Sequence, residues 1–175
     1  MKVQFCKYES SRDAHSNVSD VLDGEELDQV EELENDFISY IGADYALATS
    51  HGTSALHLAM LALDLKRGDK IVCSVNAHPN VPEVVRHFDA EPVFIDIDAD
   101  TYNINLDKLE SYLEDNKSKK LKAVIVTHVA GQCTDLDRLY NMAKIYDVKI
   151  VEDASEALGA TYKGKKIGST GADIT

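Results

Sequence analysis

Short apolar runs rich in valine and isoleucine alternate with helical patterns along this chain, and this alternation constrains the fold more than any other feature. The predicted strands cover residues 45–50, 70–74, 92–98, 121–129 and 148–153. A strand buried on both faces reads as a continuous apolar run, as the segment LKAVIVTHV does. Parallel strands joined by right-handed crossover helices produce such a pattern. We therefore predict a three-layer α/β/α domain with a mainly parallel sheet.

The segments between the predicted strands carry helix signals. The predicted helices cover residues 27–41, 51–65, 79–88, 105–116 and 135–147. Gly42 ends the first helix, and Asp135 starts the last one as its N-cap. Apolar residues go nearly all the way round the helix at 51–65, so we expect it to be buried. Residues 1–20 are polar and aperiodic and are expected to form an extended N-terminal segment, followed by one domain over residues 21–175.

Composition excludes several classes of function. The chain has 31 Asp and Glu against 18 Lys and Arg, a formal net charge of −13, which argues against a nucleic-acid partner. No run approaches the roughly 20 apolar residues that cross a bilayer, and the N-terminus shows no signal-peptide pattern. We therefore expect a soluble, cytoplasmic protein. Cys6, Cys73 and Cys133 are too widely spaced for a metal-binding motif, so we predict free thiols and no metal site.

Ligands of parallel α/β sheets bind beyond the carboxyl ends of the strands, so the residues that follow each strand are candidates for a site. The first candidate is TSHGTSAL, where a predicted strand meets a helix through Gly52 and Thr53. Free backbone amides and the helix dipole would hold a single compact phosphate there. The segment is neither a Walker loop nor a dinucleotide-binding fingerprint. In the alternative reading, Ser50 or Thr53 only caps the helix and Gly52 only permits the turn.

Two further strand ends carry usable side chains. His78 follows the strand KIVCS, and its ring could lie flat on a planar cofactor; alternatively it is a loop histidine satisfied by solvent or backbone. Asp153 ends the strand VKIVED, and Glu156 follows three residues later. A carboxylate at this place either caps the next turn or pairs with a cation in the ligand.

Blocks of sequence around these strand ends resemble the DegT-type (DegT/DnrJ) sugar aminotransferases, pyridoxal-phosphate (PLP) enzymes of the aspartate aminotransferase fold, known as fold type I. The resemblance runs from about Leu33 to the end of the chain. It is carried, in the order and spacing of the family, by ELENDFISYIGADYALATSHGTSALHLAM, GDKIVCSVNAHPN, AEPVFIDIDADTYNIN, VTHVAGQCTDLDRL and IVEDASEALGATYKGKKIGSTGAD.

The resemblance implies part of the large domain of a nucleotide-sugar aminotransferase, which transfers an amino group from an amino acid such as glutamate to a keto-sugar nucleotide. It also implies a homodimer. In the family pattern, Gly52 and Thr53 would bind the cofactor phosphate, and His78 would occupy the place of the ring stacked on the pyridine. Asp153 would pair with the pyridine nitrogen. A buried carboxylate keeps that nitrogen protonated, and the protonated ring is an electron sink.

Two departures from the family pattern qualify this reading. Glu156 stands where the family commonly has Gln or His near the phenolic oxygen of the cofactor, and an ionised carboxylate only accepts hydrogen bonds. The chain ends at Thr175, before the family's Schiff-base lysine and small domain, so we assign no catalytic residue and expect a truncated chain that is inactive alone. The lysines of YKGKKIG are expected in a hairpin turn. Two alternatives stay open: a PLP- or PMP-dependent sugar dehydratase of the same family, and a non-catalytic α/β binding or regulatory protein.

Overall fold

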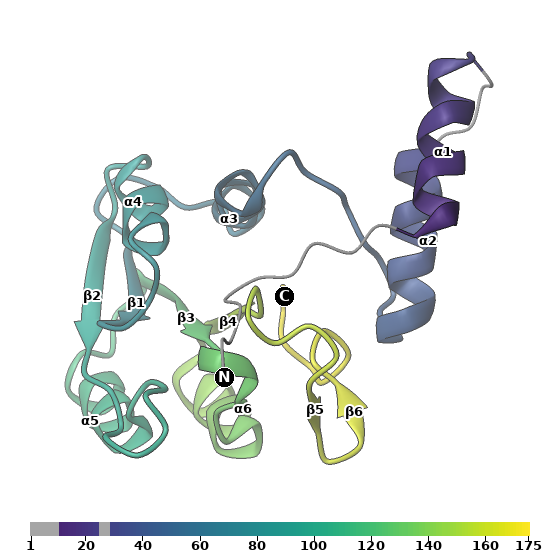
Figure 1. Cartoon of the computed structure of the whole chain (residues 1–175). Helices are drawn as coiled ribbons and strands as arrows, with labels where there is room; N and C mark the ends of the chain where they lie inside the picture. The colour runs from purple at the N-terminus through teal and green to yellow at the C-terminus, as the bar shows by residue number, and fades with distance from the viewer. Residues whose placement is uncertain (1–10, 25–28) are drawn as a thin grey trace, which may run out of the picture.

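The computed structural model describes residues 11–24 and 29–175. Its helices are α1 (Arg12–Leu22), α2 (Gln29–Ile41), α3 (Gly52–Ala62), α4 (Asn80–Arg86), α5 (Leu106–Asp115), α6 (Leu136–Tyr146) and a short 3-10 turn η1 (Val129–Gly131). Its strands are β1 (Lys70–Ser74), β2 (Glu91–Ile95), β3 (Leu121–Thr127), β4 (Lys149–Asp153), β5 (Thr161–Tyr162) and β6 (Lys165–Lys166). Figure 1 shows the central strands between two groups of helices, with α1 and α2 on the side opposite β2.

Four parallel strands form the main sheet, in the order β2-β1-β3-β4. Successive residues of a strand point to opposite faces, and β3 shows this directly: Val124 and Val126 lie in the core beside α5 and α6, whereas Ala123 and Ile125 lie in the core beside α3 and α4. Each face of the sheet is therefore covered by a helical layer. The predicted α/β fold with a parallel sheet is confirmed.

The segment at 45–50, predicted to be a strand, is irregular in the structure, and that prediction is wrong. An extended segment becomes a strand only where a neighbouring strand accepts its backbone hydrogen bonds, and no described strand pairs with it. The amide of Ala48 instead donates to the Glu34 carboxylate at 2.7 Å. The side chains of Tyr45 and Leu47 are 90% and 73% exposed, so they contribute no core contact that would fix a register.

Two other expectations need correction. Residues 1–10 lie outside the described residues, but the remainder of the expected extended segment is mostly helical, because Ser11 caps α1 by accepting from the amide of Ala14 at 3.0 Å. Helix α3 is only half buried: Met60 is fully enclosed, whereas Leu61 is 53% exposed. This helix packs against α4 along one side and leaves its other side open. The prediction that it is buried, made from apolar residues on all its sides, is therefore wrong for the open side.

Several local predictions are confirmed. Helix α2 ends at Gly42, which has the positive φ of 82° that glycine adopts readily. Asp135 caps α6 by accepting from the amide of Arg138 at 3.3 Å. The lysine-rich turn is an antiparallel hairpin of β5 and β6. These features depend on neighbours in the sequence, so local patterns are enough to predict them.

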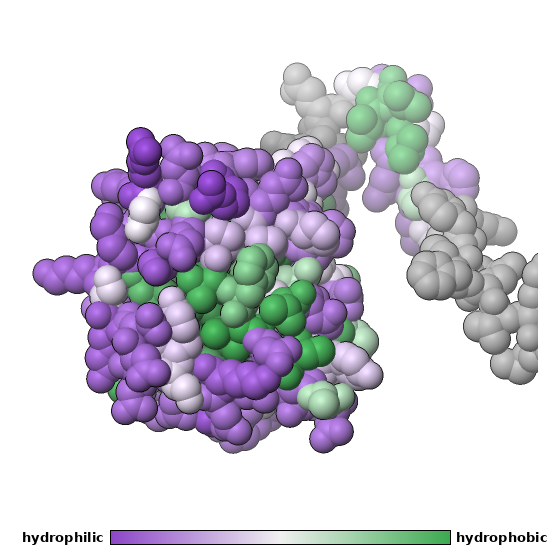
Figure 2. Space-filling view, turned by 90° about the vertical axis from the view of Figure 1, so that its left-hand side faces the viewer, coloured by the Kyte–Doolittle hydropathy of each residue, from purple (hydrophilic) through white to green (hydrophobic). Residues whose placement is uncertain are grey.

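The β2 edge of the sheet leaves apolar surface open. Figure 2 looks onto this side of the molecule and shows an apolar area framed by polar residues. Phe94 on β2 is 52% exposed, and Val75, whose amide donates to the carbonyl of Ile95 at 3.0 Å, is 51% exposed. Pro92 lies on the same edge strand and has no backbone N–H to offer to an added strand.

No described helix is long and apolar enough to cross a membrane.

Alkaline pH is expected to destabilise the fold through a buried thiol and a half-buried tyrosine hydroxyl. Burial raises the pKa of the Cys73 thiol from 9.0 to about 12, and burial together with the Glu152 carboxylate raises the pKa of the Tyr140 hydroxyl. Above about pH 9 the unfolded chain loses the Cys73 proton while the folded chain keeps it. The free energy of unfolding should therefore fall by about 1.4 kcal/mol per pH unit between pH 9 and 12, and further once tyrosine ionises in the unfolded chain.

Urea unfolding at a series of pH values from 8 to 11 would measure this slope. The Cys73→Ala variant should start from a lower stability but show a shallower decline above pH 9. An equal slope in both proteins would contradict the assignment to Cys73.

Candidate cofactor site

A cleft of about 750 Å³ opens at the carboxyl ends of β1, β3 and β4, beneath α3. The first half of α3, the loop between β1 and α4, and the chain that follows β4 form its walls. Gly52, His78, Asp153 and Glu156 all line it. Because parallel strands end at the same edge of a sheet, segments about 100 residues apart in the sequence come together here. The volume suits a ligand of cofactor size.

The N-terminus of α3 faces this cleft with free backbone donors. The amides of Gly52 and Thr53 belong to the first turn, so no helical carbonyl precedes them as an acceptor. No other acceptor bonds to them in the part of the chain that the structure describes. A Cβ built on Gly52 would meet nothing within 4 Å, so the space beside it is open. The positive end of the helix dipole adds to the attraction for an anion.

The purely structural reading of this segment is wrong in its details. The N-cap of α3 is His51, whose Nδ1 accepts from the Ser54 amide at 3.3 Å, and neither Ser50 nor Thr53 takes this role. Gly52 does not adopt a positive φ, so the turn does not require glycine for its backbone conformation. What glycine provides here is access to the helix N-terminus.

Asp153 points to the same face of the sheet as α3 and α4. Its Oδ1 accepts from the amide of Ser155 at 3.2 Å and from the Ser155 hydroxyl at 2.7 Å, and its Oδ2 lies 3.4 Å from the donating hydroxyl of Thr127. These contacts hold the carboxylate at the mouth of β4, where it lines the cleft. Asp153 was predicted to share a cleft with Thr53 and His78: His78 does line this cleft, whereas Thr53 does not, and its neighbour Gly52 lines it instead. The assignment of Asp153 to a pyridine nitrogen stays a prediction.

His78 is exposed in the loop between β1 and α4. Its Nδ1 accepts from the amide of Asn80 at 3.4 Å, which holds the ring to the start of α4. The ring lines the cleft and is free to lie against a planar ligand. Its role in stacking is a prediction that the geometry allows.

Glu156 has a partner within the protein. Its Oε2 accepts from the amide of Ala130 at 2.7 Å, in the η1 turn that follows β3. Ala130 has a φ of 53°, in the left-handed region that a non-glycine residue rarely occupies, so this bond supports a strained turn. The carboxylate thus connects the chain after β4 to the η1 turn. Its predicted contact with a cofactor stays a prediction.

The Glu156→Gln variant should keep its stability within about 0.5 kcal/mol, because the amide oxygen of glutamine can still accept from Ala130. The Glu156→Ala variant should lose about 1 kcal/mol, since the hydrogen bond is gone and the strained turn remains. Urea unfolding measures both. Equal stability of the alanine and glutamine variants would show that the contact contributes nothing.

Sequence reasoning missed two residues that shape the cleft, Asn80 and Thr127. Asn80 begins α4 and donates from Nδ2 to the Thr53 hydroxyl at 2.7 Å. Thr127 ends β3 and contacts Asp153, its register partner on β4. The signal for Thr127 was available, since it ends the strand adjacent to the one that carries Asp153. The Asn80 contact spans 27 residues and had no local signal.

A polar cluster lies directly behind the site, on the α5 and α6 face of the sheet. Glu152 and His128 have fully enclosed side chains, with Nε2 of His128 3.4 Å from Oε2 of Glu152. The Tyr140 hydroxyl donates to Oε1 of Glu152 at 2.5 Å and also contacts the Thr170 hydroxyl at 2.7 Å. Glu152 precedes Asp153 on β4, so this cluster fixes the strand end that presents Asp153.

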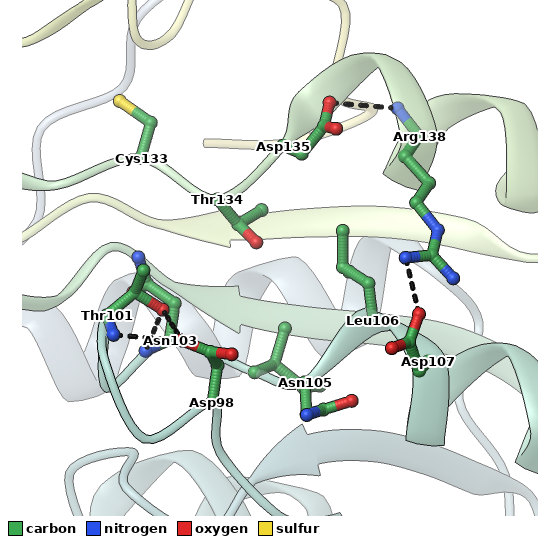
Figure 3. A pocket seen from close by; sticks show the side chains of 11 residues that line it. Asp98, Thr101, Asn103, Asn105, Leu106, Asp107, Cys133, Thr134, Asp135 and Arg138 are labelled. Atoms are coloured by element: carbon green, nitrogen blue, oxygen red, sulfur yellow. Dashed lines mark hydrogen bonds and ion pairs between the residues drawn. The ribbon is translucent and has the colours of Figure 1, made fainter.

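A second, smaller pocket of about 230 Å³ lies between the N-termini of α5 and α6. Figure 3 shows the Arg138 guanidinium facing Asp107 and the Asp98 carboxylate facing Thr101. Arg138 pairs with Asp107 at 2.7 Å and with Glu110 at 2.6 Å. Asp98 accepts from the amide of Thr101 at 2.9 Å, and this bond lowers the pKa of its carboxyl. Since these charges already have partners, the pocket is less suited to a charged cofactor than the cleft beneath α3.

The fold and the cleft together are those of the fold type I class of PLP-dependent proteins. Residues 9–175 match the DegT/DnrJ/EryC1/StrS aminotransferase family, and the chain belongs to it. The predicted family and its cofactor, pyridoxal phosphate, are confirmed by this match and by the solved relatives below.

Curated relatives support the same family. The uncharacterised protein MJ1066 of Methanocaldococcus jannaschii is 39% identical over 135 residues, which are 77% of this chain and 34% of that protein. GDP-perosamine synthase of Caulobacter vibrioides is 36% identical over 140 residues, 80% of this chain and 37% of the enzyme. The chain thus spans a little over a third of the length of these relatives.

Solved structures share the fold. The putative sugar aminotransferase Spr1654 from Streptococcus pneumoniae, in its PMP form, superposes with a TM-score of 0.86 at 27% identity, covering 97% of this chain and 46% of that one. A GDP-4-keto-6-deoxymannose-3-dehydratase with a trapped PLP-glutamate geminal diamine superposes with a TM-score of 0.80 at 25% identity, covering 90% and 42%. Both aminotransferases and a dehydratase are therefore among the relatives.

Proposed function

We propose that this chain forms the cofactor-binding part of a nucleotide-sugar aminotransferase, which moves an amino group from an amino acid such as glutamate to a keto-sugar nucleotide. One observation carries the proposal: the same cleft has free amides of a helix N-terminus in one wall and the Asp153 carboxylate in another. A phosphorylated pyridine requires an anion site and a carboxylate of this kind.

The residues of the chain have distinct tasks in this proposal. The amides of Gly52 and Thr53 bind the phosphate. The Asp153 carboxylate, oriented by Thr127 and Ser155, accepts a hydrogen bond from the ring nitrogen and holds a proton there. The His78 ring covers one face of the pyridine and excludes water from it. When bound, the cofactor supplies the electron sink that amino transfer requires.

Calorimetric titration of the chain with pyridoxamine phosphate tests the proposal. This form of the cofactor carries an amine in place of the aldehyde, so it cannot react with exposed lysines. We expect saturable binding at a single site and at least about 10-fold weaker binding of pyridoxamine, which lacks the phosphate. Equal affinity for the two compounds, or no binding of either, would contradict the assigned site.

A sugar dehydratase of the same family is the second candidate, because a dehydratase structure shares the fold at 25% identity. Incubation with the cofactor, glutamate and a keto-sugar nucleotide distinguishes the two by mass spectrometry of the product. An amino sugar supports the aminotransferase, and a deoxy sugar supports the dehydratase. Cofactor binding without either product agrees with the expectation that this chain is inactive alone and supplies only the cofactor-binding part. A homodimer and a cytoplasmic location remain part of the proposal.

A further inference from the structure

Asn80 connects the start of α4 to the start of α3. Its Nδ2 donates to Oγ1 of Thr53 at 2.7 Å, and its backbone amide donates to Nδ1 of His78 at 3.4 Å. Its Oδ1 is enclosed and has no hydrogen-bond partner within the described residues. Asn80 also lines the cleft beneath α3. It therefore contacts both the predicted phosphate-binding residue and the predicted stacking residue from one position.

The direction of this hydrogen bond determines what the Thr53 hydroxyl can do. A hydroxyl has one hydrogen to donate and lone pairs that accept. The amide nitrogen of Asn80 can only donate, so Thr53 is the acceptor and its own hydrogen stays available. The Thr53 hydroxyl donates to no other group in the part of the chain that the structure describes. Its hydrogen is therefore not taken by another group of the described chain and stays available to an anion bound at the α3 N-terminus.

We propose that Asn80 is a positioning residue for phosphate: by donating to Thr53, it orients the Thr53 hydroxyl to donate its hydrogen to the cofactor phosphate. The proposal rests on the proposed function of the cleft. It adds to the two backbone amides a third donor, whose direction is set by a residue that does not touch the phosphate. An amide turned the other way would accept from Thr53 and remove this donor.

The proposal is tested by one ratio, the affinity for pyridoxamine phosphate divided by the affinity for pyridoxamine. Calorimetry on the full chain measures both affinities. The Asn80→Ala and Thr53→Val variants should each bind pyridoxamine phosphate about 10-fold more weakly and bind pyridoxamine within about twofold of the unaltered chain. The double variant should be no weaker than Thr53→Val alone, because Asn80 acts through that hydroxyl.

Asn116→Ala is the control. Asn116 follows α5 and does not line the cleft, and its Nδ2 donates to the carbonyl of Tyr112 at 2.9 Å, so its loss should leave the ratio unchanged. Asn80→Asp keeps the shape of the side chain and decides the question if Asn80→Ala does not fold. Its carboxylate can only accept, which takes the Thr53 hydrogen away from the phosphate, and the ratio should fall at least as far as in Asn80→Ala.

The outcomes separate this inference from the proposed function. If the unaltered chain binds both compounds equally, the phosphate site itself is wrong and the inference falls with it. If the chain prefers pyridoxamine phosphate but the losses in Asn80→Ala and Thr53→Val multiply, Asn80 does not act through Thr53 and the inference is overturned alone. An unchanged ratio in Asn80→Asp, or equal losses for both compounds in Asn80→Ala, would overturn it in the same way.

Discussion

The Asp153→Asn variant is expected to bind pyridoxamine phosphate about 10-fold to 100-fold more weakly than the unaltered chain. Asparagine keeps the shape of the side chain but removes the charge that pairs with a protonated pyridine nitrogen. Ser155 can still donate to the amide oxygen, and the new amide nitrogen can donate to the Thr127 hydroxyl, so the fold should be retained. Calorimetry gives the affinity, and the absorbance of the bound ring as a function of pH reports whether its nitrogen keeps the proton.

Asp64→Asn is a suitable control, because Asp64 is exposed just after α3 and its carboxylate pairs with Lys66 at 2.7 Å. Its affinity should not change. In the Asp153→Asn variant, the ring nitrogen of the bound cofactor should lose its proton at lower pH than in the unaltered chain. Identical affinities and identical titration curves in the unaltered chain and in the Asp153→Asn variant would show that the Asp153 carboxylate does not face the ring.

The Glu152→Ala variant should lose about 2–4 kcal/mol of unfolding free energy, through a lost hydrogen bond and a cavity, the largest stability effect that we expect. Glu152 accepts from Tyr140 and lies beside His128 with no exposed side-chain surface. Truncation leaves the Tyr140 hydroxyl with only its contact to Thr170 and opens a cavity beside the buried His128 ring. Urea unfolding measures the loss, and Glu114→Ala, an exposed glutamate on α5, should change stability by less than about 0.5 kcal/mol.

The Glu152→Gln variant isolates the charge from the shape. Glutamine can still accept from Tyr140 and can donate to His128. The Glu152→Gln variant should therefore lose much less unfolding free energy than the Glu152→Ala variant. A loss under about 1 kcal/mol in Glu152→Ala would mean that the cluster behind the site adds little to the fold. Equal losses in both variants would show that the charge, and not the filled volume, stabilises the strand end.

The sequence by itself was sufficient for the elements of the sheet and for part of the site. Runs such as KIVCS and LKAVIVT form strands because their side chains are buried on both faces, and Asp135 starts α6 because its side chain caps the helix locally. Parallel strands end at one edge, so the sequence predicted one cleft for His78, Asp153 and the turn at Gly52 and Thr53, and of that turn Gly52 lines the cleft.

Only the tertiary structure decided which groups meet. The segment at 45–50 has strand-like residues but no described neighbour, and α3 has apolar residues that nothing covers. Asn80 reaches Thr53 across 27 residues, and Glu156 reaches Ala130 across 26. Local sequence sets backbone propensity and periodicity, whereas these hydrogen bonds depend on how separate crossover units pack against each other, which no local pattern records.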